Sequence, residues 1–576
     1  MDPSVYRSSP SGRSPLRIGL LVDSLSLPRC FAEVVDHILH SGFAGISLIV
    51  VNAGAPKPRT GPRRSLPKRL IDFASDSTRR RGALFNLYER WDRRNVDPAT
   101  DPLAIVDCSE RLAGIESMEV HPISKRFVHR FPDDALERIR AMDLDVLLRF
   151  GFNILRGGIL SAARHGVWSY HHGDNDYYRG GPAYFWELLE GNPVSGAILQ
   201  VLTEQLDAGK VLYKGLFATH EGFSLARNRV QPYWGASTFM IQKLRELHAH
   251  GWESVERNAL KPAPYQGRKK IYTTPSNGEM LRWLAPLLAG KALRRLTKPA
   301  AIRHWRIAVR SGGKPLPESQ AAPDMHGFRW IESPKGHFWA DPFAVEAEGK
   351  HWVFFEDFDY AAQRGKISCA EVRGEALGEA ATALERPYHL SYPCVFRDRG
   401  EWYMIPETVS AGTVELYRAA AFPYDWRFER ELLKGSAVDT TVWIEDGVYW
   451  FFVTLQEPRG YASQLWLYSA SSLDGAWTPH PANPISTDVR YARGGGAIFR
   501  YNGTLYRPSQ DCSGEYGRSM TLNAITVLDR ESYREEPRLT VDPGSMRDLV
   551  GTHTYNRAGS VEVIDGKARM PVKRVL

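Results

Sequence analysis

The C-terminal half of the chain repeats one pattern of strands and turns, and this repeat limits the fold more than any other feature of the sequence. Each copy runs from a short polar motif into an apolar strand, a glycine turn and an aromatic strand. The copies are WADPFAVEAEGKHWVFFE (339–356), SYPCVFRDRGEWYMIPE (391–407), VDTTVWIEDGVYWFFVT (438–454), ARGGGAIFRYNGTLYRPSQD (492–511) and, more weakly, THTYNRAGSVEVIDGKARM (552–570). Self-similarity at a fixed period is typical of blades that close around an axis. Five copies therefore predict an all-β five-bladed propeller over residues 303–576, with HWRIAVR (304–310) supplying the strand that closes the ring.

These repeats resemble the five-bladed propellers of arabinanase- and fructosidase-like glycoside hydrolases. They are especially similar to the domain at the N-terminus of plant glucosaminyl inositolphosphorylceramide transferases. The resemblance implies carboxylates on the innermost strands, at Asp341 in WADP and Asp439 in VDTT, with Glu407 and Asp511 as further candidates for substrate binding. The hydrolases carry their general acid in Glu-Gly-Pro at the start of the fourth blade, where this chain has Arg493 followed by three glycines. A glycosidase needs an acid as well as a base or nucleophile, so the expected acid is absent.

Three interpretations of the propeller stay open at this point. Asp341 and Asp439 can hold sugar hydroxyls or a cation, they can take part in a glycosidase or glycosyltransferase reaction, or they can cap strands in a scaffold. Tryptophans such as Trp339 and Trp443 suit stacking on sugars, although most aromatic side chains in blades serve packing.

The N-terminal half has the alternating pattern of an α/β domain. RIGLLV (17–22) and ISLIVVN (46–52) are apolar strand patterns, and the helical pattern CFAEVVDHILHSG lies between them. Strand, helix and strand at this spacing form a βαβ unit and predict a parallel sheet. Further strands are predicted at LAIVDCS (103–109), MEVHPI (118–123) and VLLRFGF (146–152). The order suits a Rossmann-like sheet, but no GxGxxG follows the first strand, so we do not expect a dinucleotide.

One window of this half, GVWSYHHGDNDYYRGG (166–181), combines histidines, carboxylates and a glycine turn at the end of a predicted strand, and QLDAGKVL (205–212) follows it. Polar residues between an apolar approach and an apolar return are typical of an active-site wall at the end of a sheet. The window resembles the catalytic core of the folate-dependent formyltransferases, the family of methionyl-tRNA, glycinamide-ribonucleotide and sugar-nucleotide N-formyltransferases. The resemblance covers roughly residues 16–250.

The family motif consists of Asn-x-His, a loop that ends in Arg-Gly, and Leu-Asp-x-Gly. The matching positions here are Ser169, His171, Arg179 with Gly180, and Asp207. The resemblance implies that Ser169, His171 and Asp207 surround the formyl carbon, where an amine attacks N10-formyltetrahydrofolate. His171 would relay the proton while Asp207 holds its tautomer. Ser169 is a departure, because the family carries asparagine there, and the loss of an oxyanion donor typically costs about 2.7–4 kcal/mol.

Neighbouring residues are candidates for substrate binding. His172 or Asn175 can replace the missing donor or fix the substrate, Arg179 suits an anionic acceptor, and Asp174 lies between them. Each motif also has a purely structural interpretation. The histidines can be buried and satisfied by backbone, Gly180 can belong to a turn ahead of the AYFWELLEG helix, and the aspartate of Leu-Asp-x-Gly can be a turn residue.

Charge and cysteine content exclude some classes. The net charge of +8 is concentrated in a basic insertion at 53–100, which suits phosphates, polyphosphorylated cofactors or an anionic surface, or is a solvated insertion. Aromatic residues are not interleaved with these charges, so we expect no nucleic-acid partner. The five cysteines are scattered without metal-ligand spacing, which predicts reduced thiols in a cytoplasmic protein and no metal site. The first 16 residues lack the apolar core of a secretory signal.

A basic amphipathic helix is predicted within a helical linker at 251–302. MLRWLAPLLAGKALRRL (280–296) has an apolar face edged by arginine and lysine. Such a helix suits either peripheral contact with an anionic membrane or packing of one domain against another. No run of about 18 apolar residues is present, so we expect no membrane span.

These features predict a multidomain protein with a disordered tail (1–16), a Rossmann-like formyltransferase-type α/β domain (17–250), the linker and the all-β five-bladed propeller. The resemblances imply formyl transfer from N10-formyltetrahydrofolate to a nucleotide- or lipid-linked amino sugar in polysaccharide or glycolipid biosynthesis, with the propeller binding the glycan. The alternatives are a carbohydrate-binding or scaffold protein that carries two degenerate enzyme folds, and a propeller-based glycosidase or glycosyltransferase.

Overall fold

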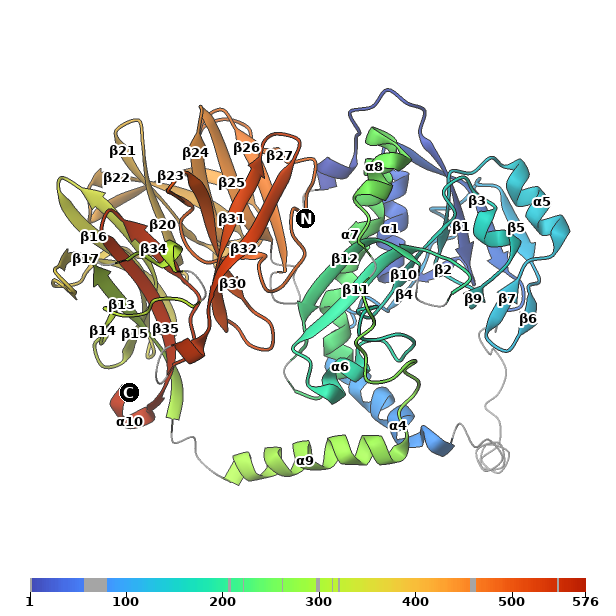
Figure 1. Ribbon diagram of the computed structural model, residues 1–576, viewed down its shortest axis with the longest axis horizontal. Coiled ribbons are helices and arrows are strands. Elements are labelled where there is room, and N and C mark those ends of the chain that lie inside the picture. Colours follow the sequence, from blue (N-terminus) through green and yellow to red (C-terminus); the bar gives the residue numbers. More distant parts are fainter. Residues whose placement is uncertain are drawn as a thin grey trace. The chain divides into compact units, whose positions relative to one another are not determined.

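The computed structural model describes residues 3–55, 80–205, 209–220, 222–261, 263–296, 301–312, 314–319, 322–455, 463–545 and 549–575. The chain divides into two compact units, one formed by residues up to Ala292 and the other by residues from Leu293 onward (Figure 1). Within the predicted tail, the 3-10 helix η1 (Pro3–Tyr6) buries Val5 and Tyr6. Only part of the basic insertion falls within the described residues, including helix α4 (Ala83–Asp92).

The N-terminal unit is built on a seven-stranded mixed sheet. In the order in which they neighbour one another, its strands are β12 (Lys210–Ala218), β11 (Val194–Val201), β10 (Val167–His171), β8 (Val146–Arg149), β1 (Leu16–Val22), β3 (Ala44–Asn52) and β5 (Ser117–Val120). The strands from β10 to β5 run parallel, and β11 and β12 pair antiparallel at one edge. Helix α1 (Arg29–Leu39) connects β2 (Ser26–Pro28), which follows β1, to β3. The α/β character predicted for this half is therefore confirmed.

One predicted strand is not part of this sheet. The segment LAIVDCS contributes β4 (Ile105–Asp107), which pairs with β2. All three residues of β4 are exposed or half-exposed, so its apolar side chains do not enter the core of the sheet. A separate small sheet contains β6 (Ile123–Lys125), β7 (Val128–Arg130) and β9 (Ile154–Leu155).

Helix α7 (Leu225–His250) fixes the strand that ends at the candidate histidines. A Cβ on Gly235 would lie 2.2 Å from a ring atom of Phe217 on β12, so only glycine allows the helix to come this close to the sheet. The backbone N–H of Met240 donates to the hydroxyl of Tyr170, 3.3 Å away on β10. Other α-helices in the described part of the unit are α5 (Asp133–Ala141), α6 (Phe185–Glu190), α8 (Trp252–Arg257) and α9 (Asn277–Leu296), the last of which continues beyond Ala292.

Within its described residues, the second unit consists mostly of β-strands, which form five antiparallel sheets. One sheet contains β14 (Arg329–Ile331), β13 (Ala301–Ser311), β35 (Val561–Pro571), β33 (Leu549–Gly551) and β34 (Tyr555–Ala558), and the next contains β15 (His337–Ala347), β16 (Lys350–Asp359), β17 (Arg364–Arg373), β18 (Ala376–Leu377) and β19 (Ala381–Leu384). The third sheet contains β20 (Ser391–Asp398), β21 (Glu401–Glu407), β22 (Thr413–Ala421) and β23 (Asp425–Lys434), and the fourth contains β24 (Ala437–Glu445), β25 (Val448–Leu455), β26 (Gln464–Ala470) and β27 (Thr478–Pro479). The fifth sheet contains β28 (Arg493–Gly494), β29 (Phe499–Tyr501), β30 (Thr504–Asp511), β31 (Ser519–Leu528) and β32 (Tyr533–Val541). Each repeat copy lies in a different sheet. HWRIAVR lies in β13, which pairs with β35 along its whole length and so joins the first strand of the unit to the last.

Three repeat copies share the same backbone irregularity near the start of their first strand. The ladder shifts register after Ala340, Ser391 and Val438, and in each case the next residue has a positive φ. Those residues are Asp341 (φ 50°), Tyr392 (φ 44°) and Asp439 (φ 48°). A bulge of this kind redirects a side chain and is over-represented next to functional sites. The repeated polar motif therefore encodes a repeated bulge.

Candidate functional site

The three bulges bring side chains from different sheets into contact. The backbone N–H of Tyr392 donates to Asp341 Oδ2 at 3.2 Å, and the Tyr392 hydroxyl lies 3.0 Å from Thr441 Oγ1 on β24. The same hydroxyl accepts from the backbone N–H of Gly496 at 2.8 Å. Asp341, Tyr392 and Asp439 are all buried. The predicted residues Asp341 and Asp439 thus belong to one buried polar network.

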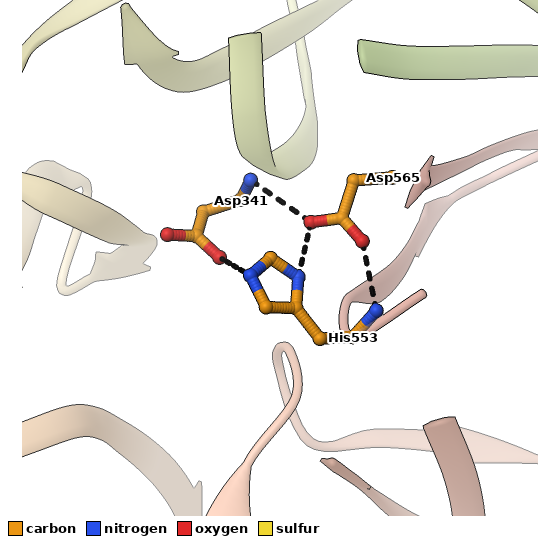
Figure 2. A group of neighbouring side chains, drawn as sticks. All are labelled: Asp341, His553 and Asp565. Carbon is orange, nitrogen blue, oxygen red and sulfur yellow. Dashed lines mark hydrogen bonds and ion pairs between the residues drawn. The ribbon is translucent and has the colours of Figure 1, made fainter. Parts of the chain in front are cut away.

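The densest part of this network is a histidine between two aspartates (Figure 2). His553 Nδ1 lies 2.5 Å from Asp565 Oδ2, and its Nε2 lies 3.6 Å from Asp341 Oδ1. Burial alone would lower the pKa of His553, but the carboxylates of Asp565 and Asp341 outweigh it and hold the pKa above the ordinary value. Trp305 stacks on the imidazole with ring centroids 3.9 Å apart. The geometry fits an imidazolium that bridges two carboxylates.

Asp565 is the anchor of this bridge. The backbone N–H groups of His553 and Thr554 donate to its Oδ1 at 2.9 and 3.0 Å. The backbone N–H of Asp341 donates to Oδ2 at 3.2 Å (Figure 2). Burial opposes ionisation of Asp565, yet the neighbouring imidazolium and these donors hold its pKa below the ordinary value. Asp341, His553 and Asp565 also form the group of described residues whose ligand atoms, within 4.8 Å of one another, could hold a metal ion.

A second charged group surrounds Asp439. Arg493 Nε pairs with Asp439 Oδ2, and Arg493 Nη2 lies 3.7 Å from Glu407 Oε2. Gln510 Nε2 donates to Asp439 Oδ2 at 2.8 Å, and the Arg493 guanidinium lies 4.7 Å from the ring centroid of Tyr516. The arginine at the start of the fourth copy therefore neutralises a predicted carboxylate instead of supplying a proton.

Burial and nearby negative charge disfavour the ionised form of two glutamates in the network. Burial, together with the charge on Asp439, raises the pKa of Glu407 well above its usual range. Burial and the charges on Asp341 and Glu407 do the same for Glu356, which lies 3.5 Å from His389 Nε2. A carboxyl with a raised pKa takes up a proton more readily, and a protonated carboxyl can donate as well as accept a hydrogen bond.

Asp511, the fourth predicted carboxylate of this unit, makes a local contact. Its Oδ1 accepts from the backbone N–H of Ser513 at 2.7 Å. Burial raises its pKa, and Arg518 and Arg490 partly offset the effect. Sequence reasoning missed His553, Asp565 and Glu356. The first two belong to the weak fifth copy, where the only signal was the match of THTY to the polar motif that opens the other copies.

In the N-terminal unit, Ser169 and His171 lie on β10 as expected, but both side chains bind protein atoms. Arg149 Nη1 donates to Ser169 Oγ at 3.0 Å, and this hydroxyl donates to the Tyr170 carbonyl at 3.1 Å. His171 is buried and its Nε2 lies 2.8 Å from the Tyr178 carbonyl, to which it donates. Asp207 lies outside the described residues. Arg149 was missed, although a charged residue inside the apolar run VLLRFGF was a signal for it.

His172 occupies a closed aromatic environment. Its ring stacks on Tyr233 with centroids 3.9 Å apart, and Nδ1 lies 3.0 Å from the Tyr184 hydroxyl. Burial, and then the neighbouring His171, lowers the pKa of His172 to about 3, so the ring is neutral. Its Nε2 is buried and has no hydrogen-bond partner within the described part of the chain, and the same holds for Asn175 Oδ1. Unsatisfied buried polar atoms of this kind are uncommon and call for an explanation.

The loop that follows His172 contacts Lys214 through two of its aspartates and Tyr265 through its arginine. Lys214 on β12 lies 2.7 Å from Asp174 Oδ1 and 2.5 Å from Asp176 Oδ2. Arg179 Nε donates to the Asn175 carbonyl at 3.1 Å, and its guanidinium lies 4.5 Å from the ring centroid of Tyr265.

Gly180 has a structural role. It has φ 95°, and a Cβ there would lie 2.3 Å from the carbonyl oxygen of Tyr272. This close approach explains the glycine of the Arg-Gly pair.

A known family matches part of the second unit. The family "Glucosamine inositolphosphorylceramide transferase 1, N-terminal" matches residues 331–558. Glucosamine inositolphosphorylceramide transferase 1 of Arabidopsis thaliana is 38% identical over 207 residues, which cover 34% of this chain and 27% of that protein. The protein of the same name from Oryza sativa subsp. japonica is 38% identical over 213 residues, covering 35% and 28%. The chain thus spans little more than a quarter of the length of these curated relatives.

Two solved structures resemble parts of the chain at low similarity. Glycinamide ribonucleotide transformylase 1 from Symbiobacterium toebii is 16% identical and covers 41% of this chain and 89% of its own, with a TM-score of 0.28. Zg3597, a family 117 glycoside hydrolase from Zobellia galactanivorans, is 12% identical and covers 47% and 92%, with a TM-score of 0.31. Scores at this level carry no argument about function. The similarity that carries weight is that of residues 331–558 to the N-terminal part of glucosamine inositolphosphorylceramide transferase 1.

Proposed function

We propose that the second unit is a five-bladed β-propeller that binds a carbohydrate, and that the protein acts in glycan or glycolipid biosynthesis. The observation that carries this proposal is the polar network in which the buried Asp341 and Asp439 lie with the half-buried Glu407 and Arg493. Carboxyl groups and a guanidinium in one place match the alternating donors and acceptors of sugar hydroxyls. The similarity of residues 331–558 to proteins named for glucosamine and inositolphosphorylceramide supports a saccharide as the ligand.

Contacts between consecutive sheets support a closed ring of five blades. In each repeat copy, the first strand or a residue close to it makes a hydrogen bond or an ion pair with the next copy. The fifth copy makes such a contact with the first copy. Around the ring, the links are Asp341 to Tyr392 (3.2 Å), Tyr392 to Thr441 (3.0 Å), Asp439 to Arg493, Ala497 to Asn556 (2.6 Å) and Asn556 to the carbonyl of Pro342 (2.7 Å).

Glycan binding is tested on an array that carries oligosaccharides with and without amino sugars. We expect the wild-type chain to bind a subset of them and Asp341→Asn to bind at least about tenfold more weakly, because a charge-assisted hydrogen bond is worth roughly 1.5–3 kcal/mol. Asp474→Asn, which changes an exposed carboxylate of the same unit, serves as the matched control. Absence of binding by the folded wild type, or an unchanged profile in Asp341→Asn, contradicts the proposal.

We further propose that the N-terminal unit transfers a formyl group from N10-formyltetrahydrofolate to an amino sugar. The observation that favours this second activity lies in the segment after His171, where two buried polar atoms, His172 Nε2 and Asn175 Oδ1, have no hydrogen-bond partner among the described residues. A bound folate or acceptor with a donor and an acceptor at this place would satisfy both atoms. The residues present therefore fit a polar ligand at the end of β10.

The proposed reaction needs three events. The amine nitrogen bonds to the formyl carbon, the bond from that carbon to N10 of the folate breaks, and one proton passes from the amine to N10. We assign the proton relay to His171 and its orientation to Asp207. Arg149, which holds Ser169 at 3.0 Å, supplies positive charge towards the developing oxyanion, and so replaces part of what the family asparagine provides.

Calorimetric titration with 5-formyltetrahydrofolate tests the folate site without knowledge of the acceptor. We expect micromolar binding by the wild-type chain and at least about tenfold weaker binding by His171→Ala, since one lost hydrogen bond and its packing are worth more than about 1.4 kcal/mol. His40→Ala, an exposed histidine on the same unit, should bind like wild type. A folded wild type that does not bind this folate contradicts formyl transfer and leaves carbohydrate binding as the function.

A further inference from the structure

Helix α9 (Asn277–Leu296, labelled in Figure 1) carries apolar residues on two sides, and those on one side are packed against described residues of the N-terminal unit. On the packed face Met280 is fully buried, and Trp283 contacts Tyr88 and Phe185 edge-on with ring centroids 5.5 and 5.3 Å apart. Leu284 joins the same cluster. The spacing i, i+3, i+4 is that of one side of an α-helix, so this side fixes α9 to the N-terminal unit.

The other face is exposed. Leu281 is 58% exposed, Leu288 is 53% exposed and Leu293 is 63% exposed. Leu281, Ala285 and Leu288 follow one another at i, i+4 and i+7, so they form a continuous stripe. Single exposed leucines are common on protein surfaces, but a stripe of them along a helix marks a contact surface.

The charge of the helix indicates what this stripe contacts. Its sequence carries Arg282, Lys291, Arg294 and Arg295 and one acidic residue, Glu279. That carboxylate is already neutralised, because Lys269 Nζ lies 2.6 Å from it. Exposed leucines next to an excess of basic residues complement a surface that is apolar inside and anionic outside, which is the boundary of an acidic lipid membrane.

We propose that α9 docks the protein on anionic membranes, with Leu281 and Leu288 inserted among the acyl chains and Arg282 at the lipid phosphates. The helix lies in the interface; no helix of the described residues is long and apolar enough to cross a bilayer. Because the opposite face is held by Met280 and Trp283, the helix is already formed before binding, so docking does not require it to fold. This inference goes beyond the proposed function and places the protein where a lipid-linked acceptor would be.

Co-sedimentation of the full chain with lipid vesicles tests the proposal. We expect binding to vesicles of phosphatidylcholine mixed with phosphatidylserine, and weaker binding as salt is added. Leu281→Glu/Leu288→Glu should reduce binding at least about tenfold, because insertion of two leucines is lost. Arg282→Gln should weaken binding about fivefold, and only to vesicles that contain phosphatidylserine. Leu87→Glu, which changes a leucine on α4 that is 63% exposed, is the matched control and should bind like wild type.

Three results would overturn the proposal. The first is equal vesicle binding by the wild type and Leu281→Glu/Leu288→Glu. The second is an equal loss of binding in Leu87→Glu, which would show a nonspecific effect of added charge. The third is a large fall in the Tm of Leu281→Glu/Leu288→Glu, or loss of a dimer in sedimentation analysis, since either would show that protein covers this face.

Discussion

Replacing Asp565 by alanine lowers the free energy of unfolding of the second unit by about 3–5 kcal/mol, the range found when one partner of a buried ion pair is removed. Asp565 is fully buried and its carboxylate accepts from three backbone N–H groups while facing the His553 ring at 2.5 Å. Alanine leaves all of these donors without an acceptor in a region that water does not reach. Thermal or chemical denaturation measures the loss.

The pH dependence of stability tests whether the loss in Asp565→Ala comes from the ion pair between His553 and Asp565. Because the folded-state pKa of His553 lies above its ordinary value of 6.5, its contribution is fully present below pH 6.5 and is lost as the pH rises through the folded pKa. Because the folded-state pKa of Asp565 lies below 3.8, its contribution is present above that value and is lost as the pH falls. We expect wild type to lose stability in both directions, and Asp565→Ala to show a flatter profile.

Two further variants separate charge from shape. Asp565→Asn keeps an oxygen for the backbone N–H groups of His553 and Thr554 but removes the charge, so it should lose less stability than alanine. Asp474→Ala removes an exposed carboxylate that pairs with Arg430 and should change the free energy of unfolding by less than about 1 kcal/mol. A loss in Asp565→Ala no greater than that in Asp474→Ala would contradict the anchoring role.

The strands of the second unit could be predicted from the sequence because each copy repeats the same local pattern of polar motif, apolar strand, glycine turn and aromatic strand. WADP, SYPC and VDTT place a polar residue before an apolar strand, and all three become the same bulge with a positive φ at Asp341, Tyr392 and Asp439. His553 was not predicted, since its copy is weak and its partners are distant in sequence. Asp341 lies 212 positions before His553, and a local sequence pattern does not predict a contact between residues that are so far apart along the chain.

In the N-terminal unit, too, the sequence predicts individual strands better than it predicts which strands are neighbours. The apolar runs predicted β1, β3, β8 and β10 because buried strands need continuous apolar residues. The segment LAIVDCS has the same composition but forms the edge pair with β2, since its neighbours in space are set by the chain's path. The contact of Arg149 with Ser169 joins two neighbouring parallel strands and likewise depends on the order of strands in the sheet.

Replacing Arg493 by methionine should also lower the free energy of unfolding by about 3–5 kcal/mol. Arg493 pairs with the buried Asp439 and lies 3.7 Å from Glu407, so methionine leaves two carboxyl groups facing each other without a cation. Burial already raises the pKa of Glu407 well above its usual range, with Arg493 opposing the shift. Without the guanidinium, the pKa of the Glu407 carboxyl should rise further. Denaturation of the variant at neutral pH measures the cost.

Arg490→Met is the matched control, because Arg490 lies three positions earlier and pairs with Asp488 at 2.6 Å in a more exposed setting. It should cost less than about 1 kcal/mol. Adding Asp439→Asn to Arg493→Met removes the uncompensated charge and should restore part of the stability, whereas Asp439→Asn alone should destabilise, because it leaves the arginine without its closest partner. Such coupling would show that the arginine at the start of the fourth copy neutralises the carboxylate of Asp439 in the folded protein. Equal losses in Arg493→Met and Arg490→Met, or no rescue by Asp439→Asn, would contradict that role.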